Sequence, residues 1–182
     1  LEISGKLGIF AETAGKSPAG TLTLNPYKND PNLSIEFKEQ GFISARSTSI
    51  GSGGNINIQA PENINIKGEG SITVETRGSG NAGIISIETE NLTIAEKVKI
   101  SASTSESGNG GNININSSQK FQLEGRILTD TKGTGDGGSI NIKTGEMNAP
   151  KSTISTKSDN VGNAGTINIA AQENITTGIL TS

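Results

Sequence analysis

Apolar residues alternate with Asn, Ser or Thr in one short phrase that recurs along the chain. It reads GGNINI over residues 53–58. Copies of the phrase end at Ile58, Ile87, Ile115, Ile142 and Ile169, and a fainter copy, AGTLTL, ends at Leu24. Alternation with a period of two predicts a short β-strand with one buried face and one solvated face.

The last glycine of each copy marks the length of a repeat. These glycines are Gly20, Gly54, Gly83, Gly111, Gly138 and Gly165. The steps between them are 34, 29, 28, 27 and 27 residues, and self-similarity at such a period is typical of repeat architectures. Because one repeat cannot bury its single apolar face alone, we expect equivalent strands of successive repeats to stack in parallel, about 4.8 Å apart.

Three short strands are predicted in every repeat, and each should contribute apolar columns to the interior. The first strand is the recurring phrase, with inward columns at Leu22, Ile56, Ile85, Ile113, Ile140 and Ile167, and at Leu24, Ile58, Ile87, Ile115, Ile142 and Ile169. The second strand carries Leu33 and Ile35, Ile64 and Ile66, Leu92 and Ile94, Phe121 and Leu123, a lone Met147, and Ile175. The third strand carries Phe10, Ile43, Val74, Ile100, Leu128, Ile154 and Leu180.

The expected fold is an all-β, right-handed parallel β-helix, or β-solenoid, of about six coils of 27–34 residues with three short strands per coil. The right hand follows from the strong preference of parallel crossover connections. An antiparallel sandwich also contains short strands at spacings near ten residues. A sandwich does not require near-identical strands every 27 to 28 residues, so the repeat favours the solenoid.

The positions between the apolar columns predict the solvated face and the turns. The outward column of the first strand is Thr23, Asn57, Ser86, Asn114, Asn141 and Asn168, whose side-chain amides are expected to hydrogen-bond along the stack. The Gly-rich turns are expected to need residues that tolerate positive φ. Residues 25–31, with two prolines and the only tyrosine, are predicted to lengthen one turn.

The whole chain, residues 1–182, is predicted to be a single β-solenoid segment of a longer repeat array. It begins inside a second strand at Leu1 and Ile3 and stops inside a third strand at Leu180. An uncapped solenoid exposes unpaired strand edges at its ends. We therefore expect the isolated segment either to fray at both ends or to stack end to end with copies of itself.

Composition narrows the classes of partner. Hydrophobic residues make up 30% of the chain and aromatic residues 3%, with no Trp, Cys or His, so the core must be thin and aliphatic. The net charge of −3 and the lack of a basic block argue against nucleic-acid binding. No apolar run approaches the roughly 18 residues that membrane insertion needs. Without cysteine, neither a disulfide framework nor a thiolate metal site can form.

The phrases GNGGNININ at residues 108–116 and NLTIAEKVKISASTSESG at residues 91–108 resemble the repeats of filamentous-haemagglutinin-like exoproteins, notably long cyanobacterial ones. The resemblance extends from about Gly20 to Ser182. It implies a large secreted or surface-attached bacterial adhesin, exported by two-partner secretion, with a right-handed β-helical shaft.

By this resemblance the chain corresponds to the shaft, with an extracellular or cell-surface location and no enzymatic activity. The expected partners are neighbouring coils or copies of the same protein, and cell-surface glycans. The resemblance carries over no catalytic residue, no cofactor and no metal ligand.

A polysaccharide-binding or polysaccharide-degrading β-helix protein is the alternative function. Enzymes of that kind gather several carboxylates on one face across adjacent coils. Here Glu75 and Asp130 are expected on the third strand or its tail, two coils apart and at different offsets. Glu88, Glu90 and Glu96 come from one coil, which indicates solvated surface charge.

Two other kinds of site are weaker alternatives. A calcium-binding nonapeptide array needs a carboxylate in every turn. Only Asp136 occupies such a turn, and Asn81, Asn109 and Asn163 take its place elsewhere. A cationic strip for anionic glycans is the second alternative. It rests on Arg46 and Arg77, expected at the same offset in successive coils, with Lys157 there later; a solvated edge is the competing interpretation.

Overall fold

The computed structural model describes residues 1–4, 8–28 and 30–182, and these residues form an all-β structure. Its strands are β1 (Glu2–Ser4), β2 (Gly8–Phe10), β3 (Thr21–Leu24), β4 (Asn32–Ser44), β5 (Asn55–Gln59), β6 (Asn63–Thr73), β7 (Ile84–Ile94), β8 (Val98–Ser101), β9 (Asn112–Leu123), β10 (Arg126–Leu128), β11 (Ser139–Ser155), β12 (Thr166–Ala171) and β13 (Ile175–Thr181). Asn29, in the turn expected to be long, lies outside the described residues.

The strands stack in parallel as a β-solenoid, which confirms the predicted fold class. The first strands of successive coils pair in the order β3, β5, β7, β9, β11 and β12. Their register places both predicted inward columns in file, including Ile56 on Ile85 and Ile85 on Ile113. The chain makes about five complete turns between β3 and β12, with a partial coil at each end, so the expected count of about six coils was slightly too high.

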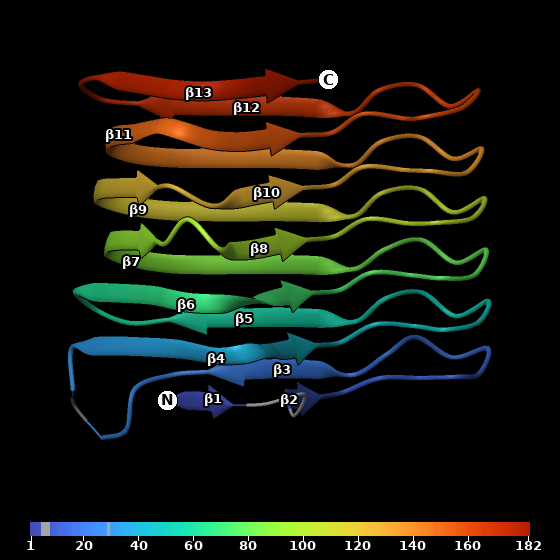
Figure 1. Ribbon diagram of the computed structural model, residues 1–182, viewed down its shortest axis with the longest axis horizontal. Helices are drawn as coiled ribbons and strands as arrows, with labels where there is room; N and C mark the ends of the chain where they lie inside the picture. The colour runs from blue at the N-terminus through green and yellow to red at the C-terminus, as the bar shows by residue number, and fades with distance from the viewer. Residues whose placement is uncertain (5–7, 29) are drawn as a thin grey trace.

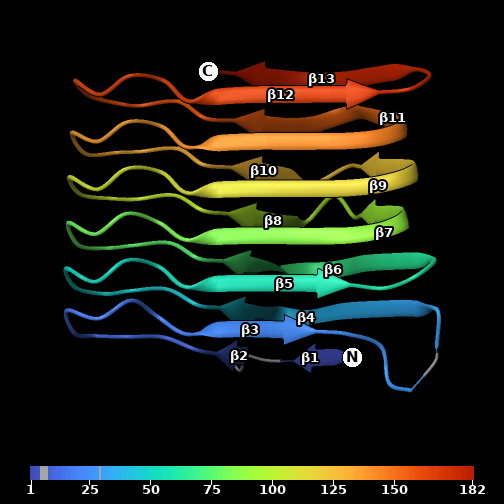
Figure 2. The ribbon, with the colours of Figure 1, turned by 180° about the vertical axis from the view of Figure 1, so that it is seen from behind.

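The path of the chain is right-handed. In Figure 1 the second and third strands run from left to right on the near side as the chain climbs from the N-terminus to the C-terminus. Figure 2 shows from behind that the first strands return on the opposite side. Each coil is therefore flattened into two strand layers, and a loop projects from one end of every coil (Figures 1 and 2).

The boundaries between the second and third strands are less marked than the sequence suggested. β4 and β6 each run through both strands, and β11 runs through all three. The breaks appear instead as register shifts, for example between Phe37 and Gly41 on β4. Glu39 and Gln40 within this break have φ angles of 52° and 62°, so the backbone bends there into the left-handed region.

The interior is a continuous aliphatic core. The central members of the first-strand columns, such as Ile56, Ile85 and Ile113, are fully buried. The second-strand column is as predicted: Leu33, Ile64, Leu92, Phe121, Met147 and Ile175 share one file. Met147 is followed at the next inward position by Ala149, which the sequence analysis missed and which is fully buried.

Three residues, Phe10, Val74 and Leu128, were wrongly assigned to the third-strand column. The observed file is Ile9, Ile43, Ile72, Ile100, Ile127, Ile154 and Leu180. Phe10 and Leu128 each follow an isoleucine directly, so their side chains fall on the outer face, and Phe10 is 47% exposed. Val74 is buried but lies two residues beyond Ile72, in the next inward position.

The glycines of the turns have a different role from the one expected. Among the residues that the structure describes, positive φ occurs only at Lys28, Glu39, Gln40 and Gly68. The marker glycines are instead required by close approach of successive backbones, because a methyl group on Gly138 would overlap the carbonyl oxygen of Gly111 one coil below. The expected positive φ at these turns was therefore wrong.

The polar ladder on the first strands is confirmed in its C-terminal half. The Asn141 side-chain amide donates to Asn114 Oδ1 over 3.1 Å, and that of Asn168 donates to Asn141 Oδ1 over 2.9 Å. These bonds lie on the outer face, one residue from the buried isoleucine columns. The ladder therefore links three successive coils outside the core.

Candidate functional site

The corner between the third strands and the projecting loops holds three of the six ion pairs found among the described residues. A row of single β-bridges fixes the register of this corner from coil to coil: Thr13, Ser47, Thr76, Thr104, Thr131 and Ser158. Several of these hydroxyls close their own loop. Thr76 Oγ1 donates to the carbonyl oxygen of Asn81 over 2.8 Å, and Thr131 Oγ1 to that of Asp136 over 2.8 Å.

The base of each loop is closed by a backbone hydrogen bond of 2.6 to 3.0 Å, in which the N–H of a marker glycine donates to the carbonyl oxygen of the residue that directly follows the third strand. The bonds join Gly54 to Ala45, Gly83 to Val74, Gly111 to Ala102, Gly138 to Thr129, and Gly165 to Thr156. Because every loop closes in the same way, the side chains that precede the bridge residues form one column along the stack.

This column, which we call the floor column, is Glu12, Arg46, Glu75, Ser103, Asp130 and Lys157. Two sequence-based assignments are corrected by it. Glu75 and Asp130 share one offset, although they lie two coils apart as expected. Arg46 and Lys157 also share that offset, but Arg77 does not. Arg77 belongs to the next outward column, which we call the loop column: Thr48, Arg77, Ser105, Lys132 and Asp159.

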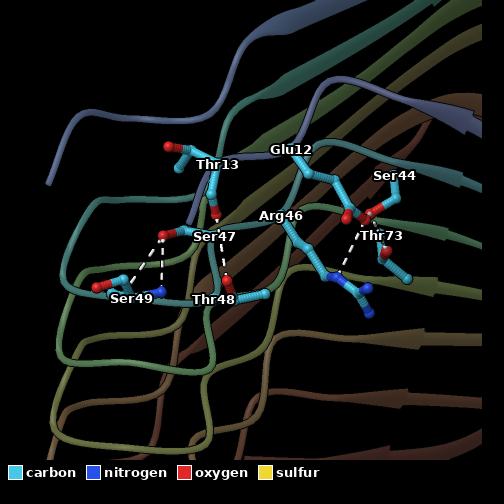
Figure 3. A network of polar contacts seen from close by, with 8 residues as sticks. All are labelled: Glu12, Thr13, Ser44, Arg46, Ser47, Thr48, Ser49 and Thr73. Atoms are coloured by element: carbon cyan, nitrogen blue, oxygen red, sulfur yellow. Dashed lines mark hydrogen bonds and ion pairs between the residues drawn. The ribbon is translucent and has the colours of Figure 1, made fainter. Parts of the chain in front are cut away.

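Opposite charges alternate at the N-terminal end of the floor column. Arg46 Nε lies 3.0 Å from Glu12 Oε1, and these side chains are 28% and 23% exposed. The Ser44 hydroxyl donates to the same carboxylate oxygen, and Thr73 Oγ1 lies 3.4 Å from Ser44 Oγ. Figure 3 shows these four side chains converging from three successive coils, while Thr13, Ser47, Thr48 and Ser49 form a separate polar group beside them.

The column continues into a groove of about 520 Å³, which we call the corner groove. It is lined by Glu75, Thr76, Arg77, Lys99, Ser101, Ser103, Thr104, Ser105, Arg126, Leu128, Asp130, Lys132, Lys157 and Asp159. The third strands supply one wall through Lys99 and Arg126, which are neighbours in one file. The loop column supplies the other wall, so the groove runs parallel to the stacking direction.

The carboxylates in the corner groove are already engaged. Glu75 Oε1 lies 2.9 Å from Lys99 Nζ. Asp130 Oδ1 accepts hydrogen bonds from the Ser155 hydroxyl and, over 3.1 Å, from the backbone N–H of Lys157. A hydrogen bond to Asp159, together with the charges of Asp159 and Asp130, raises the pKa of Lys157 above its ordinary value.

Arg77, Arg126 and Lys132 differ from the other cations of the groove. Within the described residues, none of the three takes part in an ion pair with a carboxylate. All three are exposed. The groove therefore presents a net positive charge to solvent, whereas the chain as a whole carries −3.

The other candidate residues do not converge on a reactive centre. Asp136 aligns with Asn81, Asn109 and Asn163, and Asp136 Oδ1 accepts from the backbone N–H of Asn163 over 2.7 Å. In the described part of the chain, no group of three acidic side chains is placed to hold a metal ion. Glu88 and Glu90 each contact a glutamine of a neighbouring coil, Gln59 at 3.3 Å and Gln119 at 3.0 Å. Glu96 is exposed, as expected of surface charge.

A scan against models of protein families found no match to the chain, and searches among curated proteins and solved structures found none either. The described residues contain no helix with the length and apolarity that a membrane crossing requires.

Proposed function

We propose that this chain is a structural, non-enzymatic segment of the shaft of a secreted or cell-surface bacterial filament or adhesin. The observation that carries the proposal is the unbroken register of its first strands. From Leu22 to Ile167, the same inward column continues through every coil without insertion. A stack of this kind extends along one axis, and each coil contacts only its neighbours.

Two further observations support a shaft over an enzyme. The two carboxylates that share an offset, Glu75 and Asp130, are each engaged by a partner within the corner. The repeats at residues 91–116 resemble those of filamentous-haemagglutinin-like exoproteins, whose β-helical regions are shafts. The proposal therefore includes export by two-partner secretion and a location outside the cell.

Antibodies raised against this chain test the location and the form. Added to intact cells that produce the protein, they are expected to label fibres at the cell surface in electron micrographs. Brief treatment of the intact cells with an external protease should remove the label. Antibodies against a cytoplasmic protein of the same cells serve as the control. Labelling that appears only after the cells are permeabilised would contradict the proposal.

The proposal also includes association of copies end to end. Ile175, Ile179 and Leu180 on β13 are 48%, 63% and 48% exposed. At the spacing of the repeats, β3 of a second copy pairs with β12 and continues the inward columns once β1 and β2 of that copy, which would otherwise occupy the place of β13, are displaced.

Light scattering over a concentration series measures this association. The mass of the wild-type chain should rise with concentration, because pairing of open edges buries apolar surface. The double variant Ile167→Lys/Ile169→Lys should remain monomeric. Thr166→Lys/Asn168→Lys adds the same charge to the outer face of the same strand and should still associate. A wild-type chain that is monomeric at every concentration would refute end-to-end stacking.

A further inference from the structure

We propose that the corner groove binds a linear acidic polysaccharide, one whose sugar units carry carboxylate or sulfate groups. This binding goes beyond the role of a shaft and holds whether or not the chain forms part of a filament. Five cations and three carboxylates line the groove. The carboxylates are held by Lys99, Ser155 and Lys157, which leaves Arg77, Arg126 and Lys132 for a ligand.

The spacing of these cations favours a polymer over a small anion. Arg77 and Lys132 lie in one column, two coils apart, which at the usual strand spacing is about 9.6 Å. Arg126 lies on the opposite wall, in the same coil as Lys132. Only a ligand that lies along the stack can reach all three. Arginine also pairs with planar carboxylates through two parallel hydrogen bonds, which suits repeated acidic groups.

The floor of the groove favours a sugar over a nucleic acid. The coil between Arg77 and Lys132 presents the hydroxyl groups of Ser103, on the floor column, and Ser105, on the loop column, which can exchange hydrogen bonds with sugar hydroxyls. Binding of single-stranded nucleic acid depends on aromatic side chains on which bases stack. None of the described residues that line the groove is aromatic.

Calorimetric titration of the full chain tests the proposal with defined probes. Alginate oligosaccharides supply carboxylates and heparin oligosaccharides supply sulfates; binding of either supports the shared chemistry, and their relative affinities identify the preferred group. Binding should weaken as salt is raised, because exposed charges are screened. Neutral dextran should not bind. No binding of either acidic probe, or equal binding of dextran, would overturn the inference, as would tighter binding of a single-stranded oligonucleotide.

Matched variants locate the site. Arg77→Ala/Lys132→Ala should weaken binding of the better acidic probe roughly tenfold, since two partly solvated charge contacts are lost. Lys120→Ala/Lys143→Ala removes the same charge from exposed positions outside the groove and should change the affinity by less than about twofold. Equal losses in the two double variants would show a non-specific charge effect and refute the site.

A gain of affinity provides the complementary test. Ser105 lies between Arg77 and Lys132 in the loop column and is exposed. Ser105→Arg should complete a row of three cations and tighten binding several-fold, at a position where folding is not at risk. Unchanged or weaker binding by this variant contradicts the placement of the ligand. The length of the alginate chains should stay constant during incubation; shortening would instead contradict the non-enzymatic role while leaving the binding site intact.

Discussion

Replacing Ile113 with Asn should lower the free energy of unfolding by roughly 5 kcal/mol, the sum of a core cavity and a buried amide without partners. Ile113 is fully buried and lies in file between Ile85 and Ile140. Both neighbours are apolar, so neither can hydrogen-bond to the introduced amide. Because each coil contacts only its neighbours, the substitution should weaken the packing of the coil that contains β9 against the coils above and below it.

Urea unfolding followed by circular dichroism measures this effect. Ile84→Asn is the matched control, because Ile84 is exposed and the equivalent residues of the neighbouring coils are Asn55 and Asn112. The control should leave the midpoint of unfolding nearly unchanged. If the two Asn substitutions lowered the midpoint equally, the inward assignment of Ile113 would be wrong.

Replacing Gly138 with Ala should cost about 3 kcal/mol, the upper end of the range for overpacking, because the obstacle is backbone. The added methyl group would overlap the carbonyl oxygen of Gly111 and lie 2.8 Å from Thr129 Cβ. The backbone of Gly138 is not in the left-handed region, so the cost comes from contact between coils rather than from φ. This overlap can be relieved only if the two coils move apart, and that movement weakens the hydrogen bonds between them.

Gly15→Ala separates this contact effect from the general effect of replacing glycine. A methyl group at Gly15 has Thr13 Oγ1 as its nearest neighbour, at 3.8 Å. The control should therefore leave the melting temperature unchanged or raise it slightly, since alanine restricts the unfolded chain. Similar losses in the two variants would show that the marker glycines are not required by close approach.

The first strands could be predicted from the sequence because their pattern is unambiguous. Except on β7, where Ile84 directly precedes Ile85, each carries single isoleucines or leucines separated by polar residues, and a shift by one residue would expose the whole apolar set. In the third strands this alternation is ambiguous wherever two apolar residues are adjacent. Ile127 and Leu128 satisfy the pattern equally well, and only pairing with neighbouring coils places Ile127 inside.

The wrong offsets predicted for Arg77, Glu75 and Asp130 have a related cause. Taking Val74 instead of Ile72 as the partner of Ile43 shifts the coil by two residues, which leaves every side chain on its correct face. A rule based on alternation cannot detect such a shift. It brought Arg77 into line with Arg46 and separated Glu75 from Asp130. The corner groove therefore could not be predicted from the sequence, because its two walls depend on how the residues of successive coils align.

The constant spacing of the later marker glycines also makes the length of the molecule adjustable in whole coils. Removing residues 112–138 would join Gly111 directly to Ser139, the residue that follows the next marker glycine. Ile140 would then lie on Ile85, and every apolar column would continue unbroken. A deletion or duplication of 27 residues thus changes the reach of the stack by one step of about 4.8 Å without disturbing any neighbour. Unequal recombination between repeats can generate longer and shorter variants that fold as readily as the original.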